Sequence, residues 1–116
     1  MDNDLYCKVY LKSEADLSGL KALMSEILNA GFEGRTVCAD HLQIDVFENR
    51  GAVLSSDESD RAVCWPYYLE IEPADTEVAQ PERFVVSIAT ILKALRLNGV
   101  QAVPSCDFED QLATMS

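Results

Sequence analysis

A single histidine limits the acid–base chemistry that this chain can carry. His41 is the only imidazole among the 116 residues, so it alone could serve as a histidine base for a serine or cysteine nucleophile. It follows Asp40 directly and lies three positions after Cys38, inside a stretch that we predict to be a strand. Neighbouring strand residues point to opposite faces, so neither Asp40 nor Cys38 can pair with His41 directly. We therefore predict that the chain is not an enzyme.

The cysteines, carboxylates and glycines form no recognisable metal or cofactor motif. The four cysteines contain no CxxC pair, whereas structural zinc sites usually bring their ligands in close pairs. We expect these cysteines to be free thiols that pack as small apolar groups, without an intrachain disulfide. The acidic run at 57–60 lacks the central glycine and terminal glutamate of a calcium loop. The five glycines are dispersed, which excludes a glycine-rich phosphate loop, so we predict no cofactor.

The net charge of −11 is the most unusual property of the chain. This charge repels the phosphates of nucleic acids and of anionic membranes, so neither is an expected partner. It attracts a basic protein and accelerates the encounter with it. The first residues lack the basic and apolar parts of a signal peptide, and no apolar run approaches the roughly 20 residues of a membrane span. We expect a cytoplasmic protein.

Two kinds of periodicity predict the secondary structure. Alternation of apolar and polar residues predicts strands, and apolar residues at helical spacing predict helices. Ser13 followed by Asp16 has the spacing of a helix-capping pair, and Pro81 suits the first turn of a second helix. The expected strands cover residues 5–12, 36–48, 62–72 and 100–103, and the expected helices cover residues 14–30 and 81–98.

The order of these elements predicts one α+β domain over residues 1–116, with an acidic tail from about residue 105. Two strand–helix–strand units around a central hairpin form the ferredoxin-like βαββαβ arrangement, a two-layer sandwich. Right-handed crossovers place both helices on one face of an antiparallel sheet. The expected strand order is 4-1-3-2.

The sheet face away from the helices is the predicted contact surface. Exposed aromatic side chains that lie close together indicate a binding surface, and tyrosine offers a large contact area with few rotatable bonds. Acidic residues on the same face would repel RNA, which other sheets of this kind bind through their aromatic residues. The predicted partner-binding residues on the face are Tyr10, Asp45, Phe47, Tyr68, Glu70 and Glu72.

The acidic tail is a second candidate contact. Asp107, Glu109 and Asp110 follow the last predicted strand, without a basic residue among them. A basic protein partner is the interpretation we favour for both surfaces. A homodimer formed through the sheets is an alternative occupant of the open face.

With these elements placed, the chain resembles small bacterial immunity proteins of polymorphic-toxin and contact-dependent-inhibition systems. The resemblance lies in its size, its acidic charge, its order of strands and helices, and its acidic Cys106–Asp110 ending. It implies a cytosolic protein that neutralises a basic toxin domain by binding it. The alternative is a small-ligand-binding regulatory domain of the ferredoxin-like, amino-acid-sensor type, with a pocket between a helix and a strand.

Overall fold

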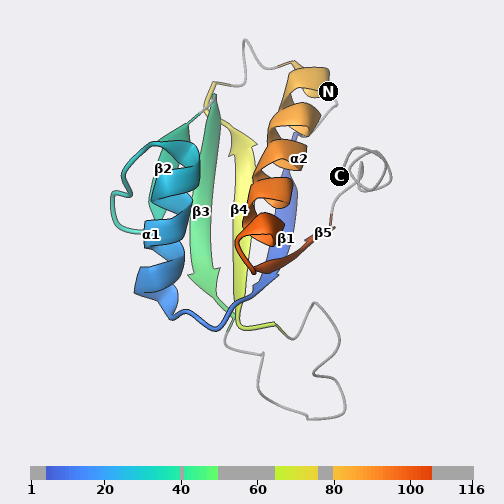
Figure 1. Cartoon of the computed structure of the whole chain (residues 1–116). Helices are drawn as coiled ribbons and strands as arrows, with labels where there is room; N and C mark the ends of the chain where they lie inside the picture. Colours follow the sequence, from blue (N-terminus) through green and yellow to red (C-terminus); the bar gives the residue numbers. More distant parts are fainter. Residues whose placement is uncertain (1–4, 40, 50–64, 76–79, 106–116) are drawn as a thin grey trace.

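The computed structural model describes residues 5–39, 41–49, 65–75 and 80–105 (Figure 1). Over these residues the protein is a mixed α+β structure with an antiparallel sheet and two helices, as its sequence predicts, but the sheet has five strands instead of the expected four. In chain order the elements are β1 (Cys7–Lys12), α1 (Leu17–Leu28), β2 (Thr36–Ala39), β3 (Leu42–Glu48), β4 (Tyr67–Pro73), α2 (Pro81–Leu97) and β5 (Gln101–Ser105).

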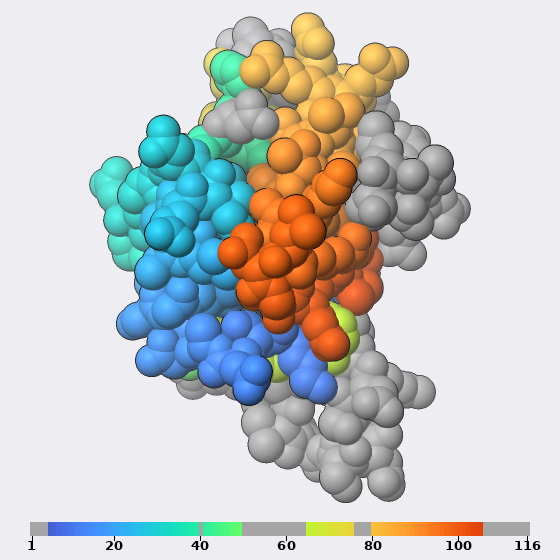
Figure 2. All heavy atoms as spheres, viewed as in Figure 1, coloured from blue at the N-terminus to red at the C-terminus, as the bar shows by residue number. Residues whose placement is uncertain are grey.

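Both helices cover the same face of the sheet. The strands lie in the order β2-β3-β4-β1-β5, and α1 and α2 run side by side in front of them (Figure 1). In the space-filling view the atoms of the two helices lie against each other and hide most of the sheet (Figure 2). The opposite face therefore carries no helix from the described residues.

The hydrophobic core lies between the helices and the sheet. Alternate residues of the strands point into it, including Val9, Ile44 and Leu69, each with less than 1% of its surface exposed. The apolar side chains of α2 pack on these strand residues, and Leu92 of α2 is completely buried. Period two in the strands and period 3.6 in the helix thus bring both sets of apolar side chains to one layer.

The first helix is shorter than predicted. Asp16, expected inside the helix, is its N-cap, and its Oδ1 accepts a hydrogen bond of 2.8 Å from the Gly19 amide. Ser13 instead accepts from the Ala15 amide, outside the helix. At the other end Asn29, which lies inside the predicted helix, takes the left-handed conformation with φ 54° and ends α1. A carboxylate is an effective cap, so the helix begins after Asp16.

The predicted long strand over residues 36–48 is in fact two strands. A turn at His41, whose φ of 64° lies in the left-handed region, separates β2 from β3 and folds them into a hairpin. His41 is therefore an exposed turn residue rather than a strand residue. Val37 and Ala39 face the core side, and Cys38 points to the open face. Cys38 is an exposed free thiol, so our expectation that it packs as an apolar group is wrong.

The other boundaries differ at strand ends. Of the strand predicted at residues 62–72, residues 62–64 lie outside the described residues. β4 itself begins at Tyr67. The last strand continues through Pro104 to Ser105. Proline is tolerated there because β5 is an edge strand of the sheet. The helix predicted from Pro81 to Asn98 is confirmed as α2, which ends before Gly99 with φ 84°.

Candidate functional site

Three aromatic residues form a row across the open face of the sheet. Tyr10 of β1 lies directly opposite Tyr68 of β4, and Tyr68 lies directly opposite Phe47 of β3. Residues in such register project side by side, with Cβ atoms about 5 Å apart. Val103 of β5 extends the row, because it pairs with Tyr10 and is 39% exposed. Four neighbouring strands thus present one continuous apolar and aromatic line.

The rings of the aromatic row touch one another. Phe47 stacks on Tyr68 with their centroids 5.0 Å apart and their planes 18° from parallel. Tyr10 is tilted by 55° from Tyr68, at 6.4 Å. Such pairs contribute about 0.5–1.5 kcal/mol beyond the burial of their area. These contacts restrict the rings in a half-exposed position. The surface is therefore rigid enough to bind without a large loss of side-chain entropy.

Two basic residues lie over the aromatic row. The Lys8 ammonium is 4.3 Å from the centre of the Tyr68 ring and 5.2 Å from that of Tyr10. The Arg35 guanidinium is 4.9 Å from the centre of Phe47. The alternation of residues along β1 predicts that Lys8 lies on this face. The sequence did not predict the position of Arg35, because Arg35 lies in the loop before β2. Its position follows from the hairpin, in which the Val46 amide donates to the Arg35 carbonyl.

The acidic residues occupy the neighbouring rows. Asp45 lies opposite Glu70, a pair of like charges that is unfavourable by itself. Lys8 lies opposite Glu70 on its other side, and the Thr36 hydroxyl donates a hydrogen bond to Asp45. Both contacts reduce the repulsion. Glu72 in the next row accepts a hydrogen bond of 3.3 Å from the Gln43 amide.

The six predicted contact residues of the sheet are therefore brought together, but the face is not uniformly acidic. Asp45, Glu70 and Glu72 share it with Lys8 and Lys12. The described residues hold ten Asp and Glu and seven Lys and Arg, a net charge of −3, so −8 of the total −11 belongs to residues outside them. The predicted tail residues Asp107, Glu109 and Asp110 lie outside the described residues.

The surroundings of Tyr6, a tyrosine at the margin of the face, raise the pKa of its phenol. Partial burial and then the charge of Glu70 raise the pKa of the Tyr6 phenol above its usual value. A hydrogen bond between the two side chains acts in the same direction. Tyr6 therefore stays a neutral hydrogen-bonding group beside the aromatic row at physiological pH.

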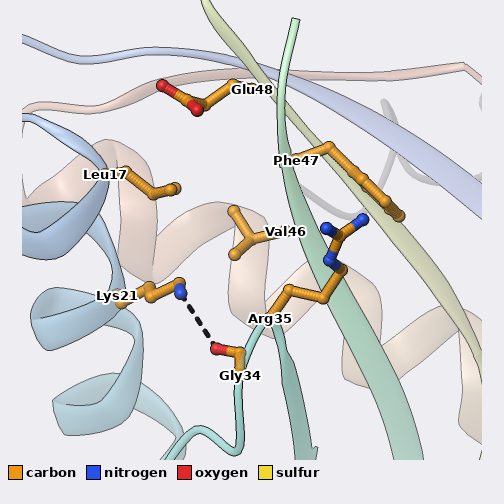
Figure 3. Close-up of a pocket in the computed structure, with 7 residues that line it drawn as sticks. All are labelled: Leu17, Lys21, Gly34, Arg35, Val46, Phe47 and Glu48. Carbon is orange, nitrogen blue, oxygen red and sulfur yellow. Dashed lines mark hydrogen bonds between the residues drawn. The ribbon is translucent and has the colours of Figure 1, made fainter.

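A hollow of about 400 Å³ adjoins the face where α1 passes the end of β3 (Figure 3). Leu17 and the buried Val46 are apolar residues of its lining, and Lys21 and Glu48 lie at its opposite ends (Figure 3). The Lys21 ammonium donates a hydrogen bond of 2.9 Å to the Gly34 carbonyl. The sequence predicted none of these as ligand-binding residues, because they come from three separate segments.

No cluster of metal-ligating side chains is assembled among residues 5–39, 41–49, 65–75 and 80–105. No three potential His, Cys, Asp or Glu ligands come together in these segments. No helix of the described chain is long and apolar enough to cross a membrane.

Comparisons with protein-family models, curated proteins and solved structures found no match.

Proposed function

We propose that the chain is a non-catalytic protein-binding module whose open sheet face binds a basic protein partner. The fold we infer for it is the ferredoxin-like βαββαβ sandwich. The order β5-β1-β4-β3 supplies its four strands, and β2 is an additional edge strand.

The aromatic row Tyr10–Tyr68–Phe47 carries this proposal. A sheet face that only meets water is usually polar, whereas this one keeps three aromatic rings in contact with one another. Tyrosine is enriched among the residues that dominate binding energy at protein interfaces. Charged groups around the rings would form the polar rim of such an interface.

The charge of the chain supports a basic partner. The net charge of −11 attracts a positively charged protein over a range set by the Debye length, about 8 Å at physiological salt. Asp45, Glu70 and Glu72 lie beside the aromatic row, where they can pair with the partner's basic residues. Lys8 and Arg35 require acidic or aromatic groups at matching positions on the partner.

An immunity protein that neutralises a toxin domain is the specific form of this proposal. A nuclease toxin must be basic to hold its substrate, and an acidic protein can cover the same surface. Charges at the rim would mainly raise the association rate, and buried tyrosines would slow dissociation.

Affinity capture from a lysate of the source cells, followed by measured binding, tests the proposal. The bait is the full chain, and the matched baits carry Tyr68→Ala together with Phe47→Ala, or Val86→Ala. Val86 is 49% exposed on α2, on the helix side of the molecule, so its loss leaves the aromatic row intact.

We expect a basic protein to be held by the full chain and by the Val86 variant, and to be lost from the double variant. Surface plasmon resonance with the purified partner should then give slower association as salt increases. Equal binding by the double variant would disprove the open face as the contact surface. A captured partner with acidic charge would disprove the electrostatic part.

A further inference from the structure

The open face is complementary to itself about the line between β4 and β1. Across the strands its aromatic row reads apolar, tyrosine, tyrosine, apolar: Phe47, Tyr68, Tyr10 and Val103. In the neighbouring charged row, Glu70 of β4 and Lys8 of β1 stand on either side of the same line with opposite charges. A half-turn about this line exchanges β4 with β1. It therefore lays each member of a pair on the other member in a second copy.

The charges favour this line as the position of a two-fold axis. An axis parallel to the strands, between β4 and β1, brings Lys8 of each copy to Glu70 of the other and Tyr10 to Tyr68. An axis along β4 would instead oppose Glu70 to itself, and an axis along β1 would oppose Lys8 to itself. Like charges that meet in this way are unfavourable, so only the axis between the two strands pairs both charges.

We propose that the open face binds the open face of a second copy about this axis. Two sheets that pack face to face lie about 10 Å apart with their strands nearly aligned, as an axis parallel to the strands requires. Lys8 already lies over the Tyr68 ring, and removal of this contact from water strengthens it. Two pairs of Lys8 with Glu70 and a cluster of four tyrosines form the centre of the interface.

The edges of the sheet are less suitable for a second copy than the face is. On β5 the Arg96 guanidinium donates a hydrogen bond of 2.8 Å to the Ala102 carbonyl, and Pro104 has no amide hydrogen. On β2 the amide and the carbonyl of Thr36 both bond to Glu33. An added strand would need these backbone groups, so a second copy meets the face rather than an edge.

The expected dimer is weak. Four strands about 4.8 Å apart and four rows of alternate residues about 6.8 Å apart cover about 500 Å² of each copy. The total of about 1,000 Å² lies at the lower limit for specific interfaces. The second copy covers the rings proposed to bind the basic partner, so the two compete for the face, and this consequence rests on the proposed function.

Sedimentation equilibrium of the full chain, without any partner, is the first test. At about 150 mM salt the repulsion between two copies of net charge −11 is screened beyond about 8 Å. We expect a dimer with a dissociation constant between about 1 and 100 μM. In NMR spectra recorded over the same concentrations, the amide signals of β1 and β4 should shift and those of α1 should not.

Exchange of the two charges then identifies the contact. Lys8→Glu and Glu70→Lys each bring like charges together across the axis, so each variant alone should dimerise at least about tenfold more weakly. An equimolar mixture of the two variants should recover the native affinity, because each acidic position then meets a basic one. Lys93→Glu and Glu82→Lys make the same changes of net charge at exposed positions of α2 and should leave dimerisation unchanged. Thermal unfolding verifies that every variant is folded.

Three results would overturn the proposal. The first is a native chain that remains monomeric at about 1 mM. The second is a set of concentration-dependent amide shifts that spares β1 and β4. The third is a mixture of the two charge variants that dimerises no better than either variant alone. The first two results come from the native chain and need no variant to fold.

The test separates this proposal from the proposed function. A monomeric chain that still captures a basic protein through the open face would overturn the dimer and leave the proposed function intact. A dimer that recovers its affinity in the mixture but captures no basic protein would support the second copy as the occupant and contradict only the proposed function.

Discussion

The two faces of the sheet are built from alternate residues of the same strands, yet they differ in burial, in residue type and in charge. On the helix side, Val9 and Leu69 are buried without a polar contact. On the open side, their neighbours Tyr10 and Tyr68 are half exposed and lie near charged groups. The first face stabilises the fold by removing apolar surface from water. The second retains apolar surface that folding has not buried, which leaves it available for a partner.

Leu92→Ala should give the largest effect, a loss of folding stability from the buried face. Leu92 is fully buried between α2 and the sheet, and truncation of such a residue costs about 2–5 kcal/mol of stability. Urea unfolding should show this loss, and Val86→Ala on the exposed side of α2 should cost less than about 0.5 kcal/mol. Similar midpoints for the two variants would mean that the helix layer does not carry the core.

Tyr68→Ala should separate binding from stability. It removes the stack on Phe47 and the contact with Lys8, so we expect a stability loss of about 1 kcal/mol. Partner affinity should fall by more, about 2 kcal/mol or above, if Tyr68 is central to the interface. Urea unfolding and calorimetry with the captured partner measure the two effects. A larger loss in stability than in binding would assign the aromatic row to folding.

Charge reversal should identify which acidic surface guides the partner. Asp45→Lys together with Glu70→Lys alters the open face, and Asp107→Lys together with Glu109→Lys alters the tail. The pair nearer the contact should slow association by on the order of tenfold at low salt. Stopped-flow kinetics across a salt series measures this rate. Insensitivity of the rate to salt and to both pairs would exclude electrostatic guidance by these residues.

Asp16→Ala should weaken the helix layer while leaving the open face unchanged. The Asp16 carboxylate accepts the Gly19 amide, and loss of such a cap costs about 1 kcal/mol. Asp16→Asn keeps an accepting oxygen and should recover most of that energy in urea unfolding. Partner affinity of the folded protein should not change. A change in affinity would show that the two faces are coupled.

The smallest expected effect is a loss of stability at high pH. Burial, and then the charges of Asp16 and Glu48, raise the pKa of Tyr67 above its usual value of 10.0. The folded state favours the neutral phenol, so this contribution is complete below pH 10 and is lost as the pH rises through the folded pKa. Tyr67→Phe, which lacks the 3.3 Å bond to the Ala15 carbonyl, should show a smaller decline between pH 9 and pH 11. An equal decline would assign the effect to other groups.

Local patterns were reliable where one segment contained the whole signal. Pro81, the apolar stripe and Asn98-Gly99 define α2 without help from other elements. The hairpin turn was missed because apolar alternation across residues 36–48 has no glycine or proline to interrupt it. His41 adopts the left-handed conformation there, so the burial of Cys38 was predicted incorrectly.

The sequence by itself determined that the sheet has an aliphatic face and an aromatic, charged face, since alternation along each strand decides this locally. Only the tertiary structure decided that Tyr10, Tyr68 and Phe47 form one row, because that depends on the pairing register of three strands. It also placed Arg35 over Phe47, and Lys21 across a hollow from Glu48. These contacts join residues far apart in the chain, and their positions are set only when the strands pair and α1 packs on them.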